Sequence, residues 1–162
     1  MIDICSEFCH KMSMKTIVAA VDFSDVTPPV METASGLAAA LGAQLHLIHT
    51  VDPGPNYAVY GFSPAEFPVS PITDKARENA GNRLKALADT FPLPGDQVTV
   101  ATITAMPVEG ILRYAKENDA DLIIVGAHGH GFLGAMLIGS VAQGIVRRAE
   151  RPTLIVPGRK DK

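Results

Sequence analysis

Cysteine is almost absent from this chain. Of 162 residues only two are cysteines, Cys5 and Cys9, and both lie within the first ten positions. A disulfide scaffold is therefore excluded, and a reducing compartment is expected. Cys5, Cys9 and His10 have the residue types of a metal clip, but a closed zinc site needs four ligands, so a frayed tail is the preferred interpretation. The segment before Met14 has no apolar run and is not predicted to be a secretory signal.

A strong charge of either sign is also missing. The chain has 14 Lys and Arg against 17 Asp and Glu, a net charge of −3. This argues against broad, charge-driven binding to nucleic acid. Residues 33–51 and 122–146 lack these charged residue types and are long enough to span a bilayer, but they contain glycine, glutamine and histidine. Buried strands joined to helices of small residues are expected there, and no membrane span.

Short apolar segments alternate with helical ones along the chain. Strands are expected at 16–21, 44–51, 98–103, 122–125 and 153–156, with helices beginning near Pro28, Ile72, Pro107 and Ser140. Strands that are apolar on both faces and separated by helices predict an α/β fold. We expect an open, doubly wound, five-stranded parallel sheet of order 3-2-1-4-5 with helices on both faces. The expected division is one domain at 14–158, a frayed or disordered extension at 1–13 and a short polar tail at 159–162.

Local signals mark the ends of some of these elements. Ser24 or Thr27 could cap the first helix, and Gly42 is expected to end it. Ser140 is expected to cap the last helix. Residues 52–71 are expected to form a long loop, functional or mobile, because five prolines lie between 53 and 71.

Two segments carry the residue types of a ligand site. Asp22 directly follows the first strand, and a glycine-rich segment, 126–139, follows the fourth. In the expected strand order both meet at the crevice where such sheets bind ligands. Glycines let the backbone approach an anion closely, and Gly139 and Ser140 stand at a helix start, where phosphate is favoured. The sequence predicts a phosphate site, against the alternative that these glycines only turn the loop.

The spacing of the glycines narrows the kind of site. A Walker loop needs a lysine, and none lies between Lys116 and Lys160. Residues 129–134 match the dinucleotide pattern, but only 28 residues follow and no acid ends the next strand, so that match is interpreted as accidental. Gly126-x-x-Gly129, nine residues, then Gly139-Ser140 resembles the universal stress protein family. Residues 18–24, 47–51 and 151–156 resemble its first, second and closing strands, and the resemblance covers about residues 14–158.

The resemblance implies a cytoplasmic homodimer that binds ATP, or AMP or ADP, with Mg or Mn carried on the phosphates. Members of the family with the full glycine motif typically bind ATP, and some hydrolyse it slowly. We therefore expect a nucleotide-dependent stress-response protein. Hydrolysis should be slow or absent, since no residue stands out as a base and the glycine loop holds no Lys or Arg.

The family motif also implies the residues of the site, none of them catalytic and none holding a metal. Adenine and ribose are expected near Ala20, Val21 and Asp22, although some members have proline at the position of Ala20. The backbone of Thr50 and Val51 is expected at the adenine edge. Ribose and phosphates are expected along Gly126, Ala127, His128, Gly129, His130 and Gly131, and the terminal phosphates at Gly139, Ser140 and Val141.

Two other functions stay open. One is an enzyme acting on an adenylated or phosphorylated small molecule, with Asp22 holding a metal or acting as base. The other is a nucleotide-free dimeric scaffold. His46 and His49 are interpreted as satisfied strand histidines. The last strand is short and apolar, so we expect it at the sheet edge, pairing with its copy through Thr153–Val156 in a homodimer.

Overall fold

A single parallel sheet forms the centre of the molecule. The structure is a computed structural model that describes residues 14–53, 71–91, 93–128 and 138–158. Its strands are β1 (Thr16–Ala20), β2 (Gln44–Val51), β3 (Val98–Thr104), β4 (Leu122–Gly126) and β5 (Thr153–Val156). Their order is β3-β2-β1-β4-β5, and every neighbouring pair is parallel. The predicted fold class and strand order are confirmed, and strand bounds differ from the predicted ones by one residue at most.

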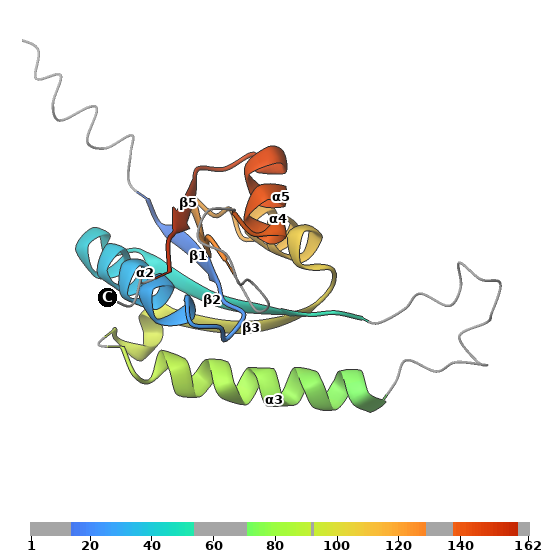
Figure 1. Cartoon of the computed structure of the whole chain (residues 1–162). Helices are drawn as coiled ribbons and strands as arrows, with labels where there is room; N and C mark the ends of the chain where they lie inside the picture. Colours follow the sequence, from blue (N-terminus) through green and yellow to red (C-terminus); the bar gives the residue numbers. More distant parts are fainter. Residues whose placement is uncertain (1–13, 54–70, 92, 129–137, 159–162) are drawn as a thin grey trace, which may run out of the picture.

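Helices cover both faces of this sheet (Figure 1). They are α2 (Thr27–Leu41), α3 (Pro71–Ala88), α4 (Pro107–Glu117) and α5 (Ser140–Arg148), with a short 3-10 turn, η2 (Gly95–Gln97), before β3. Helices α2 and α3 pack into one core through Val30 and Leu84. Helices α4 and α5 pack into a second core through Ile111 and Ile145. None of the helices in the described segments is long and apolar enough to cross a membrane.

Successive residues of a strand contribute alternately to the two cores. Ile17 and Ala19 of β1 face the α2 and α3 core, whereas Val18 between them faces the α4 and α5 core. Ile124 and Ile123 of β4 divide in the same way. All five side chains are buried. Since successive side chains of a strand point to opposite faces, a strand covered on both sides must be apolar throughout, and this explains the continuous apolar runs in the sequence.

Helix α2 starts without a side-chain cap, so the prediction that Ser24 or Thr27 caps it is wrong. The residue at the cap position is Val26, and it makes no side-chain capping bond. A capping oxygen accepts from the second or third N–H of a helix, and these positions are Pro28 and Pro29, which have none. The end of the helix is as predicted, with Gly42 at a φ of 62° and its N–H donating to Ala38 O.

Ser140 is also not a cap, contrary to prediction. The cap residue of α5 is Gly139, whose backbone is extended (φ −62°, ψ 159°), and Ser140 is the first helical residue. Its hydroxyl is therefore not used to close the helix start. The expected N-terminal extension and C-terminal tail lie outside the described residues, as do residues 54–70 of the loop expected at 52–71, whereas Pro71 already begins α3. The division of the chain at 14 and 158 stays a prediction.

Close packing of α4 against α5 depends on Gly144. A Cβ built at Gly144 would lie 2.6 Å from Cγ2 of Val108, a side chain with little rotamer freedom. We predict that Gly144→Ala lowers the free energy of unfolding by about 1–3 kcal/mol, because overpacking forces the helices apart. Urea denaturation measures this change.

The matched control for Gly144→Ala is Gly36→Ala in α2, where a Cβ would meet nothing within 4 Å. That variant should gain about 0.5–1 kcal/mol from helix propensity. A Gly144→Ala protein as stable as Gly36→Ala would contradict this account of the helix pair.

The pair formed by His46 and Tyr114 predicts a pH dependence of stability. His46 Nδ1 lies 3.2 Å from the Tyr114 hydroxyl, between β2 and α4. Burial lowers the pKa of His46 from its ordinary value of 6.5. Below pH 6.5 the unfolded chain therefore takes up this proton more readily than the folded chain, so stability falls as pH falls towards the folded-state pKa. His46→Gln, which cannot titrate, should flatten the decline in unfolding free energy between about pH 7 and pH 5. Equal slopes for both proteins would contradict this assignment.

Candidate functional site

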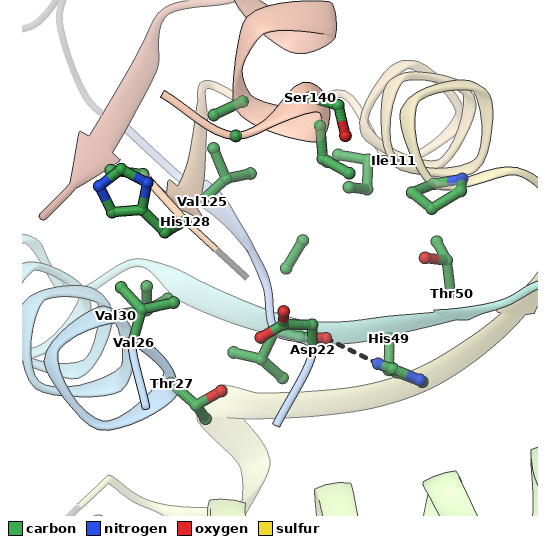
Figure 2. Close-up of a pocket in the computed structure, with 18 residues that line it drawn as sticks. Asp22, Val26, Thr27, Val30, His49, Thr50, Ile111, Val125, His128 and Ser140 are labelled. Atoms are coloured by element: carbon green, nitrogen blue, oxygen red, sulfur yellow. Dashed lines mark hydrogen bonds between the residues drawn. The ribbon is translucent and has the colours of Figure 1, made fainter. Parts of the chain in front are cut away.

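A cleft of about 470 Å³ opens at the carboxyl edge of the sheet, where β1 and β4 end (Figure 2). Its volume lies in the range of small-molecule sites. The chain diverges here, because β1 leads to α2 on one face and β4 leads towards α5 on the other. The lining residues are Ala20, Val21, Asp22, Val26, Thr27, Val30, His49, Thr50, Pro107, Ile111, Val125, Gly126, Ala127, His128, Gly139, Ser140, Val141 and Ala142.

Most of the residues singled out in the sequence lie around this cleft. Those that line it are Ala20, Val21, Asp22, Thr50, Gly126, Ala127, His128, Gly139, Ser140 and Val141. Val51 does not line it, and the carbonyl oxygen of Val51 accepts from the N–H of Ala105 at 3.1 Å. Gly129, His130 and Gly131 lie outside the described residues. The cleft thus joins segments more than 100 residues apart in sequence.

Asp22 is oriented by the turn that follows β1. Its Oδ1 accepts from the backbone N–H of Ser24 at 3.0 Å and from the Ser24 hydroxyl at 2.5 Å. The carbonyl of Ser24 in turn accepts from the N–H of Thr27 at 2.9 Å. Ser24 therefore links the carboxylate to the first residue of α2. Two donors on one carboxylate oxygen fix the orientation of the Asp22 side chain.

The same turn contains a backbone conformation unusual for its residue. Phe23 has a φ of 63°, which costs a side-chain-bearing residue about 1–2 kcal/mol. Its ring is held between two neighbours: the His49 ring at 4.7 Å between centroids, and the Arg83 guanidinium 3.9 Å from the ring centroid. Residues of β2 and α3 thereby stabilise the turn that presents Asp22.

His49 lines the cleft, although the sequence assigned it no role there. Its Nδ1–H donates to the carbonyl of Val21 at 2.7 Å, since a carbonyl can only accept (Figure 2). The interpretation of His49 as a satisfied strand histidine is thus confirmed for this nitrogen. Strand alternation could have placed His49 on the face of Leu45 and Leu47, but only the fold shows that β2 ends beside the cleft.

The opposite wall depends on the absence of a side chain at Gly126. A Cβ there would lie within 2.4 Å of Cγ1 of Val26, at the start of α2. The N–H of Gly139 donates to the carbonyl of Ala127 at 2.7 Å, and this bond anchors the start of α5 beside the end of β4. Ser140 lies at the cleft with its side chain labelled in Figure 2, and the residue is exposed.

The helix starts around the cleft differ in what they offer an anion. At α2 the second and third positions are Pro28 and Pro29, so two of the usual N–H donors are missing. At α4 the first turn carries Glu109, whose pKa is lowered by its hydrogen bond from Arg148. Helix α5 has neither proline nor acid in its first turn. An anion in the cleft is therefore favoured at α5, next to Ser140.

An apolar wall completes the cleft, and the sequence did not predict it. Its members come from the N-terminal ends of α2, α4 and α5 and from β4: Val26, Val30, Pro107, Ile111, Val125 and Ala142. They carry no chemical signal in the sequence, because their position depends on how the helices pack. Among the described residues no three His, Cys, Asp or Glu side chains are grouped closely enough to hold a metal ion. The arrangement suits a ligand with a flat apolar part and an anionic end.

Comparison with known proteins gives the family. The model of the universal stress protein family matches residues 14–157. Universal stress protein A homolog 2 of Coxiella burnetii is 33% identical, and the match covers 88% of this chain and 93% of that protein.

Two solved structures share the fold. A universal stress protein in complex with cAMP is 24% identical with a TM-score of 0.60, covering 89% of this chain and 97% of that chain. The universal stress protein from Archaeoglobus fulgidus in complex with dAMP is 22% identical with a TM-score of 0.56. That match covers 90% of this chain and 99% of the other chain. At these identities the likeness concerns the fold alone, whereas the family model spans nearly all of the described chain. The chain belongs to the universal stress protein family.

Proposed function

We propose that this chain binds adenine nucleotides, ATP in particular, in the cleft between β1 and β4, and that it acts as a nucleotide-dependent regulatory protein of the stress response. One observation carries the proposal: apart from Val51, the described residues expected to hold a nucleotide gather around a single cleft of about 470 Å³. The cleft combines an apolar wall with Asp22 and with an anion-favouring helix start at Ser140.

The chemistry of the walls gives the nucleotide an orientation. Phosphates go to the start of α5, where the N–H groups of the first turn and the Ser140 hydroxyl can donate. The nucleoside goes to the end of β1, because the Asp22 carboxylate repels phosphate and accepts hydrogen bonds from sugar hydroxyls. A divalent ion, Mg²⁺ or Mn²⁺, would accompany ATP on its phosphates, since Mg²⁺ shares phosphate oxygens and keeps several waters.

Relatives of the same fold support the ligand class. The structures in complex with cAMP and dAMP hold adenine monophosphates, so the fold accommodates this base. The triphosphate in our proposal rests instead on the glycine and serine spacing of this sequence.

Hydrolysis is expected to be slow or absent. The described lining contains neither Lys nor Arg to stabilise charge in the transition state. Asp22 is poorly suited as a general base, since Ser24 donates twice to its Oδ1. The enzyme alternative therefore has less support than nucleotide binding, and the nucleotide-free scaffold is the alternative that a binding measurement decides.

The direct test is to purify the full chain without added nucleotide, denature it, and identify released small molecules by chromatography and mass spectrometry. We expect ATP, ADP or AMP, and binding of ATP by calorimetry after the nucleotide is removed. No released nucleotide, together with no binding of ATP or AMP at millimolar concentration, would favour the scaffold.

A substitution at Ser140 tests the orientation. Ser140→Ala should weaken ATP binding about tenfold or more, because a charge-assisted hydrogen bond to phosphate is lost, and should leave adenosine binding unchanged. Ser140→Thr keeps the hydroxyl and is the matched control. Equal losses for ATP and adenosine in Ser140→Ala would contradict phosphate binding at α5.

We also propose that the chain forms a homodimer through β5, in the cytoplasm as the family resemblance implies. Strand β5 lies at the edge of the sheet, and Leu154 and Ile155 on it are only partly buried. An apolar edge strand invites pairing with a second copy, and this pairing would use Thr153–Val156.

Light scattering at micromolar concentration is expected to give the mass of a dimer. Thr153→Lys should shift the protein towards the monomer, because an edge lysine opposes strand pairing. Its unfolding temperature serves as a control for folding. A monomeric wild-type protein would contradict the dimer.

A further inference from the structure

Thr27 carries a buried hydroxyl with no hydrogen-bond partner in the structure as described, and this residue lines the cleft. It is 5% exposed and is the first residue of α2. Figure 2 shows its side chain in the lower wall of the view, with the oxygen on the side of Asp22. Native proteins satisfy nearly all buried polar groups, so an unsatisfied hydroxyl in the wall of a ligand cleft indicates a missing partner.

The local backbone explains why Thr27 finds no partner of its own. A helical threonine often donates to the carbonyl three or four residues earlier, as Thr33 does to Pro29 O at 2.8 Å. For Thr27 the carbonyl three residues earlier is that of Ser24, which lies before the helix and accepts from the Thr27 N–H at 2.9 Å. Four residues earlier the chain is at Phe23, whose φ of 63° breaks the helical path.

Thr27 and Asp22 form one polar edge of the cleft. Both line it, and Ser24 binds both: it donates to the carboxylate of Asp22 and accepts from the N–H of Thr27. Around them the start of α2 presents Val26 and Val30, and between these two residues lie Pro28 and Pro29, which have no N–H groups. This edge offers a carboxylate that accepts and a hydroxyl that both donates and accepts, so it suits neutral hydroxyls and not phosphate.

We propose that Thr27 and Asp22 together recognise the sugar of the bound nucleotide, an inference that rests on the proposed function. Asp22 accepts from one of the two vicinal ribose hydroxyls, and the Thr27 hydroxyl pairs with the other. The ligand class is then a ribonucleotide in preference to its deoxy forms. The Thr27 oxygen is shielded from solvent, and rotation about χ1 presents it to the sugar, since threonine in helices occupies two rotamers.

The test is Thr27→Val, which keeps the shape and removes the hydroxyl. The free variant should unfold about 2–4 °C higher than wild type, because an unsatisfied buried group is gone. Its affinity for ATP should fall about five- to tenfold. Its affinity for one of 2′-deoxyATP and 3′-deoxyATP, the one that lacks the hydroxyl contacted by Thr27, should match that of wild type. Calorimetry with the three nucleotides measures this, and Thr27→Ser, which keeps the hydroxyl, is the control.

The outcomes separate the two proposals. Unchanged ATP affinity in Thr27→Val, or equal losses for all three nucleotides, would overturn the sugar assignment while the wild-type protein still binds ATP. A wild-type protein that binds none of the three overturns the proposed function and, with it, the sugar site. Both proposals are supported if Thr27→Val no longer distinguishes ATP from one of the two deoxy nucleotides, while Thr27→Ser still does.

Discussion

Strand β1 pairs with β4 in the middle of the sheet, and the site depends on that pairing. Ala20 lies level with Val125, so the chain leaves both strands at the same edge. From there β1 leads to α2 on one face, while β4 leads towards α5 on the other. A cleft remains between the two exits, and Asp22 and Ala127 line it. The lack of a side chain at Gly126 lets the start of α2 approach the end of β4 closely.

The starts of α2 and α5 differ in their N–H donors and in the charge beside them, so the two sides of the cleft favour different parts of a ligand. Pro28 and Pro29 remove donors from the start of α2, and Asp22 adds a carboxylate nearby, so that side disfavours phosphate. The start of α5 keeps its N–H donors and carries Ser140. In the orientation that we propose, charge directs the phosphates of a nucleotide towards α5, and hydrogen bonds direct its sugar towards Asp22 and Thr27.

The fold could be predicted because short strands, three of them apolar almost throughout, alternate with helical segments along the chain. Residues at the ends of the strands, such as Asp22 and Gly126, could be predicted as well, since strand order brings strand ends together. The apolar wall of Val30 and Ile111 could not, because it depends on how helices pack. The error at the α2 cap was avoidable: two prolines leave a capping side chain nothing to bind.

The most direct test of this account is a titration of ¹⁵N-labelled protein followed by NMR, with adenosine in one series and ATP in the other. We expect both ligands to shift the amide signals of Asp22 and Thr27, and only ATP to shift those of Ser140 and Val141. The proposed orientation would be contradicted if adenosine shifted the Ser140 signal, or if ATP shifted signals at neither end of the cleft.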